Sequence, residues 1–192
     1  MAAPFLLWLP EPTKDVPAEY PYLAGKKVCV VVWAEPDTLF EYPHVQREVS
    51  EHVAEAMRQG FKTADVASVS FVPNQQVVEF QGRNPRWDRM HPAEIGERFA
   101  AERVLMIELT QYTTREPDAG HLYRGRIAAN VKVYDTAYPG STYSYRAAIE
   151  VAYPPESHGA WGTDDRGILK ATLELFASEV AGKFYDRKVK IR

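Results

Sequence analysis

Apolar residues follow two different patterns along this chain, and the patterns separate a first half from a second half. In the first half, Lys27–Trp33 and Val104–Leu109 are nearly continuous apolar runs, and we expect the second strand to extend to Tyr112. Such runs predict strands buried on both faces, as in a parallel sheet covered by helices. In the second half, Ile127–Tyr134 and Tyr143–Val151 alternate apolar with polar residues, which predicts strands with one buried face.

Apolar residues spaced three and four apart predict the helices between these strands. One helix is expected from about Pro43 to Gln59, ended by Gly60, and another from about Asp165 to Tyr185. The shorter elements predicted are a strand over Ser68–Val72, a helix over Pro73–Phe80 and a helix beginning at Pro92. This order predicts an α/β fold of α+β character. Its mixed sheet has a parallel first half and an antiparallel C-terminal meander, with helices packed on it.

The 192 residues are expected to form a single domain that is large enough to bury its own core. Prolines are frequent in the first 25 residues, which predicts an extended strap over residues 1–25 ahead of one domain over residues 26–192. Phe5–Leu9 is too short to span a bilayer and lacks the flanks of an export signal. We therefore expect either a cytoplasmic chain or an exported one whose signal has been removed.

The net charge and the cysteine content limit what this chain can bind and which covalent bonds it can form. A net charge of −3 and a pI near 6.0 argue against binding to nucleic acid. The short basic segment Arg83–Arg89 is weak support for it, and we interpret Trp87 in that segment as packing over a helix end. Cys29 is the only cysteine, so no intramolecular disulfide can form, and its apolar neighbours predict a buried side chain.

Several segments together resemble bacterial cell-envelope lipoproteins of the CsgG-like family and the amino-terminal domain of TolB. The similar segments are Lys26–Val32, the helix through Val53 and Met57, and Pro92–Gly96 followed by the Val104–Leu109 strand. The resemblance covers residues 26–185. It implies an exported, lipid-anchored periplasmic protein that acts by binding or assembly, without enzymatic activity. We predict no cofactor. The anchoring cysteine is expected upstream of residue 1.

The chain also departs from these families. Glu102-Arg103 stands where the families have alanine and aspartate, and no propeller follows as it does in TolB. The hairpin at Thr113–Tyr123 is short, whereas the pore-forming members carry long membrane-spanning hairpins. We therefore predict that this protein forms no pore.

The loop over residues 154–165 is the most site-like segment, because it combines a histidine, a tryptophan and paired acids. General acid–base catalysis could use such groups, but one of the acids capping the last helix explains the pair equally well. We therefore predict no catalytic residue and treat the following side chains as candidate contacts to a ligand or partner: Trp87, His158, Trp161, Asp164 and Asp165.

Metal and phosphate sites are not predicted. His44, Glu48 and His52 are spaced by four and share a helical face, but the order of a zinc peptidase motif is missing. The turn Ala34–Thr38 has no glycine and two acids, which would repel a phosphate.

Three functions therefore stay open at this point. The first is a non-enzymatic lipoprotein domain, periplasmic or at the outer membrane, that acts in envelope assembly or transport. It would bind a protein partner or further copies of itself, with membrane contact only through the upstream anchor. The second is a small hydrolase that uses the loop over residues 154–165. The third is a cytoplasmic ligand-binding domain.

Overall fold

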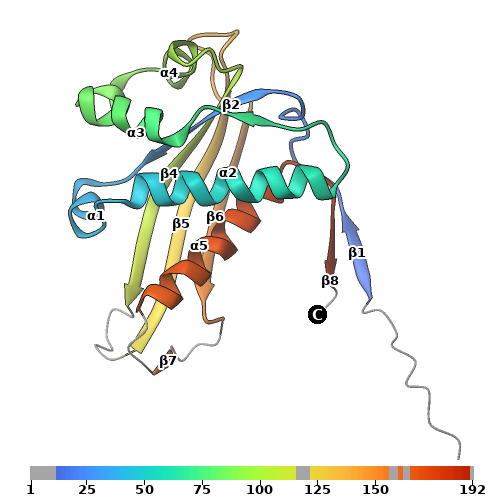
Figure 1. The fold of residues 1–192 in the computed structure, drawn as a ribbon, viewed down its shortest axis with the longest axis vertical. Helices are drawn as coiled ribbons and strands as arrows, with labels where there is room; N and C mark the ends of the chain where they lie inside the picture. The colour runs from blue at the N-terminus through green and yellow to red at the C-terminus, as the bar shows by residue number, and fades with distance from the viewer. Residues whose placement is uncertain (1–11, 116–121, 156–159, 162–164, 191–192) are drawn as a thin grey trace, which may run out of the picture.

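A computed structural model of the chain describes residues 12–115, 122–155, 160–161 and 165–190. These residues form one mixed sheet, helices on both of its faces and a separate two-stranded ribbon (Figure 1). The strands are β1 (Thr13–Val16), β2 (Lys27–Trp33), β3 (Ser70–Phe71), β4 (Arg103–Arg115), β5 (Leu122–Asp135), β6 (Tyr145–Tyr153), β7 (Ala160–Trp161) and β8 (Arg187–Lys190). The helices are α1 (Pro36–Glu41), α2 (Val45–Thr63), α3 (Asn74–Arg83), the 3-10 turn η1 (Trp87–Arg89), α4 (Pro92–Arg98) and α5 (Asp165–Ala181).

The large sheet has the strand order β3-β2-β4-β5-β6, with β7 added at the end of β5. β2 runs parallel to both β3 and β4, and Cys29 lies opposite Val104. β4, β5 and β6 are antiparallel neighbours, with Val131 opposite both Ile107 and Ala147. The predicted fold class is confirmed, including its parallel first half and its antiparallel meander.

Helices cover the two faces of this sheet unequally, which explains the two hydrophobic patterns. α2 and α5 cross one face, where Val30, Leu105 and Val131 are buried (Figure 1). α3, η1 and α4 cover the opposite face of β2 and β4, where Cys29 and Met106 are buried. The central strands therefore have an apolar side chain at nearly every position.

The far face of β5 and β6 carries polar side chains. Lys132 of β5 forms an ion pair with Glu108 of β4 at 2.7 Å, and Arg146 of β6 donates to the side-chain oxygen of Asn130 at 3.1 Å. Glu150 is exposed on the same face. Every second residue of these strands faces water, which produces the alternation seen in the sequence.

Gly60 does not end α2 as predicted. The helix continues to Thr63, and Gly60 is buried inside it. A Cβ built at Gly60 would overlap the ring of Tyr185, so this glycine is required by a close approach between two segments. Gly82 likewise lies inside α3, where a Cβ would meet nothing within 4 Å.

The end of the last helix also differs from the prediction. The last helix ends at Ala181 rather than at Tyr185, and β8 follows it. β8 pairs with β1, in a segment that the prolines predicted to be an extended strap. Tyr20 and Leu23 of the same segment are buried in the main core. The division at residue 25 stays a prediction.

Some other helices and strands begin or end a few residues away from their predicted bounds. The strand expected over Ser68–Val72 consists of Ser70–Phe71 only, and α1 forms in a segment expected to be a loop. β4 continues to Arg115 where a loop was expected to begin.

Candidate functional site

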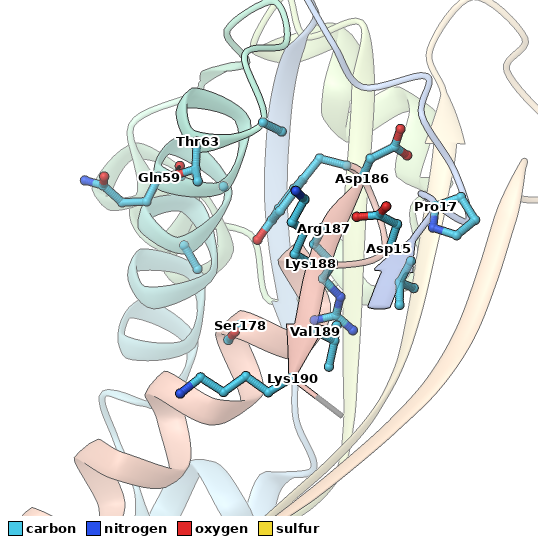
Figure 2. Close-up of a pocket in the computed structure, with 15 residues that line it drawn as sticks. Asp15, Pro17, Gln59, Thr63, Ser178, Asp186, Arg187, Lys188, Val189 and Lys190 are labelled. Atoms are coloured by element: carbon cyan, nitrogen blue, oxygen red, sulfur yellow. Dashed lines mark hydrogen bonds between the residues drawn. The ribbon is translucent and has the colours of Figure 1, made fainter. Parts of the chain in front are cut away.

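A hollow of about 1110 Å³ lies between the β1–β8 ribbon and the helices α2 and α5 (Figure 2). The C-terminal half of α2 lines it with Ala56, Gly60 and Thr63. Ser178 lines it from α5, and Tyr185 from the segment that follows α5. We take this hollow as the candidate functional site, because segments from both ends of the chain build it.

The floor of the hollow is aromatic and tightly packed. Tyr185 lies against the backbone of Gly60, and its ring meets Phe61 edge to face with the ring centroids 5.8 Å apart. Burial raises the pKa of the Tyr185 hydroxyl above its ordinary value, so the group is protonated and neutral at neutral pH.

The ribbon forms the opposite wall and is strongly basic. β1 and β8 together carry four basic side chains and one acidic side chain, Asp15, which lies opposite Lys188. We call these two strands the basic arm. Most of the arm is exposed, and a two-stranded ribbon is marginally stable in water on its own. Contacts at the base of the arm must therefore hold it in place.

Polar contacts fix the base of the arm to α5 and to the N-terminal segment. The Arg187 guanidinium lies over Gly182 and forms an ion pair with Glu179 at 3.2 Å. A side-chain oxygen of Asp186 accepts from the backbone N–H of Ala18 at 2.8 Å. These contacts connect the C-terminal strand to both the last helix and the N-terminal segment.

Glu19 completes the base of the arm. Its carboxylate accepts from the Lys183 ammonium at 2.6 Å and from the Tyr145 hydroxyl at 2.7 Å. The hydrogen bond from Lys183, and after it the one from Tyr145, lowers the pKa of Glu19 below its ordinary value. Burial, and after it Glu19, raises the pKa of Tyr145.

The side chains that line the hollow define the chemistry that is available there. Its described lining contains hydroxyl and charged side chains but no histidine and no cysteine. Cys29 lies elsewhere in the core, and burial raises the pKa of its thiol to about 12, so it is not a nucleophile at neutral pH. In the part of the chain that the structure describes, no group of three or more His, Cys, Asp or Glu side chains could hold a metal ion.

A second exposed feature lies at the opposite end of α2. We call residues 35–41, which contain α1, the acidic projection, because they carry three carboxylates and no basic residue. The Phe40 side chain is 89% exposed, whereas Leu39 packs against the main core. Tyr42 follows the projection, and its ring meets the Tyr112 ring edge to face at 4.8 Å. Leu39 and Tyr42 therefore hold the acidic projection against the body of the protein, while the Phe40 ring between them faces water.

The candidate residues from the 154–165 loop do not line this hollow. His158 and Asp164 lie outside the described residues. Trp161 is the second residue of β7, and its backbone lies opposite Leu122 of β5. Asp165 is the first residue of α5. A contact role for these four loop residues stays a prediction.

Trp87 lies on η1, in the smaller core cluster on the other face of the sheet. It is 8% exposed and packs with Val77 and Ile95. Its ring is therefore part of the packing between α3 and α4, and a role in ligand contact stays a prediction.

The tyrosines that the sequence gathers around the last hairpin are divided between the two faces of the sheet. Tyr134 lies near Tyr143 and meets the ring of His91 edge to face at 5.5 Å. Tyr145 faces the opposite way and packs against Tyr20 with the ring centroids 5.4 Å apart. These residues therefore do not form one aromatic surface.

The helix that contains the spaced histidines is used for packing and hydrogen bonds. His52 bonds through Nδ1 to the backbone oxygen of Glu48 at 2.8 Å, and His44 precedes the first residue of α2.

None of the helices described here has the length and apolar character needed to cross a bilayer.

Solved structures show which proteins share this arrangement. Neither the family models nor the curated proteins gave a match to this sequence. A PelC dodecamer from Paraburkholderia phytofirmans aligns over 91% of this chain and 98% of its own, with 13% identity and a TM-score of 0.54. XCC0632 from Xanthomonas campestris, of family DUF330, aligns over 90% of each chain, with 11% identity and a TM-score of 0.55. Lipoprotein GNA1162 from Neisseria meningitidis aligns over 82% of this chain and 99% of its own, with 15% identity and a TM-score of 0.50.

The chain shares the fold of bacterial proteins that include lipoproteins. The alignments cover most of this chain and nearly all of each neighbour, so the likeness is not confined to one small part of the fold. The comparisons do not confirm the resemblance to the CsgG-like family and to the amino-terminal domain of TolB, which stays a prediction.

Sequence reasoning missed both the hollow and the acidic projection. The local signal for the arm was the group of basic residues around Val189 in Arg187–Lys190. The signal for the projection was an apolar pair, Leu39 and Phe40, placed between acids.

Proposed function

We propose that this chain is a non-enzymatic lipoprotein domain of the bacterial cell envelope that assembles with copies of itself and acts by binding envelope partners. The observation that carries the proposal is the fold, which the chain shares over nine-tenths of its length with a PelC dodecamer. The fold shared with lipoprotein GNA1162 supports a place in the envelope. We place the domain in the periplasm or on the periplasmic face of the outer membrane.

The features of the candidate site also support a binding function. The hollow is open, its described lining contains no histidine or cysteine, and a basic arm stands over it. At the other end of α2, the exposed Phe40 side chain is an aromatic group of the kind enriched at protein interfaces. Binding through such surfaces requires no bond to be made or broken.

Two measurements test the proposal. Sedimentation velocity of the purified chain from 1 to 100 µM should show species of several times the 21.8 kDa monomer mass. Fractionation of cells of the native host should recover the protein with the envelope. A monomer at every concentration would overturn the self-assembly, and recovery in the cytosol would overturn the location.

A further inference from the structure

α1 and the β1–β8 ribbon lie at opposite ends of α2 (Figure 1). The hollow between that ribbon and α2 is therefore at the opposite end of α2 from the acidic projection. α2 has 19 residues, which corresponds to about 28 Å at the usual rise per residue. Leu39 and Tyr42 pack the projection onto the body of the protein, so Phe40 cannot reach the hollow of its own chain. Each chain therefore presents one feature at each end of the same helix.

The two features are complementary in apolar character. Phe40 exposes the largest fraction of its surface among the large apolar side chains that the described residues expose. The hollow has an aromatic floor at Tyr185, apolar walls at Ala56 and Val189, and about 1110 Å³ of space. A phenylalanine ring fits such a volume with room for the backbone on either side of it. Burial of the ring would remove a large apolar surface from water.

The two features are also complementary in charge. The projection carries the carboxylates of Glu35, Asp37 and Glu41, and the arm beside the hollow is predominantly basic. Lys188 lines the hollow on the side of the arm (Figure 2). Opposite charges around a buried aromatic anchor favour association and fix its orientation.

We propose that Phe40 of one chain inserts into the hollow of a second copy, with the carboxylates around Phe40 placed against the basic arm of that copy. The inference rests on the proposed self-assembly and specifies the surfaces that meet. The contact joins two different surfaces, so it is head to tail. Each added chain offers a new free end, and the assembly ends only when the last hollow receives the first Phe40.

The first test removes the anchor. Phe40→Ala should raise the concentration at which half of the chain is assembled by a factor of about 30 or more, the cost of losing a buried aromatic hot spot. Tyr138→Ala is the matched control, because Tyr138 is 65% exposed and lies in the turn between β5 and β6. The control should assemble as the unchanged protein does. Circular dichroism and thermal melting of each variant establish that it is folded.

The second test fills the hollow. Ser178→Trp places a large side chain in the hollow from an exposed position on α5 and should also prevent assembly. Lys170→Trp is its control, since Lys170 is exposed on the same helix and does not line the hollow. A mixture of Phe40→Ala chains and Ser178→Trp chains should form 1:1 dimers and nothing larger. In the mixture, the Ser178→Trp chain keeps its Phe40 and the Phe40→Ala chain keeps its hollow. One contact can therefore form between the two chains and none beyond it, a result expected only for a head-to-tail contact.

The third test exchanges the charges. Asp37→Lys and Lys188→Glu should each weaken assembly, and the chain that carries both should regain it. Loss in both single variants without recovery in the double variant would contradict the proposed pairing of the projection with the arm.

The outcomes separate this inference from the proposed function. If the unchanged protein is a monomer at every concentration, the self-assembly itself is overturned. If it assembles and Phe40→Ala assembles equally well, self-assembly stands and the contact proposed here is overturned. Assembly of Phe40→Ala or Ser178→Trp chains into full-sized oligomers on their own would likewise exclude the hollow as the receiving surface.

Discussion

Gly60→Ala should destabilise the protein although it replaces glycine with the best helix former. In the middle of a helix, this replacement alone is worth up to about 1 kcal/mol in favour of alanine. At Gly60 the new methyl group would overlap the Tyr185 ring, which would have to move out of the hollow. Overpacking of this kind costs about 1–3 kcal/mol, and the moved ring also loses its contact with Phe61. We expect a net loss of about 1–2 kcal/mol, because the steric cost exceeds the gain in helix propensity.

Gly82 provides the matched control for this prediction. It also lies inside a helix, but it is exposed and a Cβ there would meet nothing within 4 Å. Gly82→Ala should therefore stabilise the protein by about 0.5–1 kcal/mol. Urea unfolding followed by tryptophan fluorescence measures both variants. In a Tyr185→Ala background, Gly60→Ala should become stabilising. Equal stabilisation by the two alanine variants in the unchanged background would refute the reasoning.

Three further predictions concern the core and the base of the arm. Phe176 is fully buried between α5 and the sheet, so Phe176→Ala should cost about 3–5 kcal/mol in urea unfolding, and a loss below about 1 kcal/mol would contradict the assignment of the core. Cys29 should resist a thiol reagent at pH 8 and react fully in denaturant, because its pKa is raised to about 12; rapid labelling of the native protein would contradict its burial. The pKa of Glu19 is lowered in the folded protein, so its contribution is present above the unfolded pKa and is lost as the pH falls through the folded pKa. Glu19→Gln should therefore reduce thermal stability at pH 7 and make less difference at pH 2–3, and an equal reduction at both values would exclude the carboxylate as the cause.

The sheet could be predicted because its signal is local. The bounds of β2 are as predicted, since Lys27–Trp33 is a buried central strand with apolar residues on both faces. The alternation of apolar and polar residues in β5 and β6 predicted that each strand has one buried face, because burial decides which side chains are apolar. Each of these patterns lies within one segment and is set directly by burial.

The features that could not be predicted depend on contacts between distant residues. Thr13 pairs with Lys190, and nothing within either segment specifies the other. Gly60 reads as a helix end in the sequence, but its real partner, Tyr185, lies more than a hundred residues later. The hollow exists only because both contacts form, so no local pattern could have located it.

The pairing of β1 with β8 has a mechanical consequence. Thr13 and Lys190 lie opposite each other at the outer end of the ribbon, so the two ends of the described chain leave the body at one point. A force applied between Thr13 and Lys190 would open this ribbon one residue pair at a time, starting at the outer end. The large sheet would carry no load until all four pairs had separated.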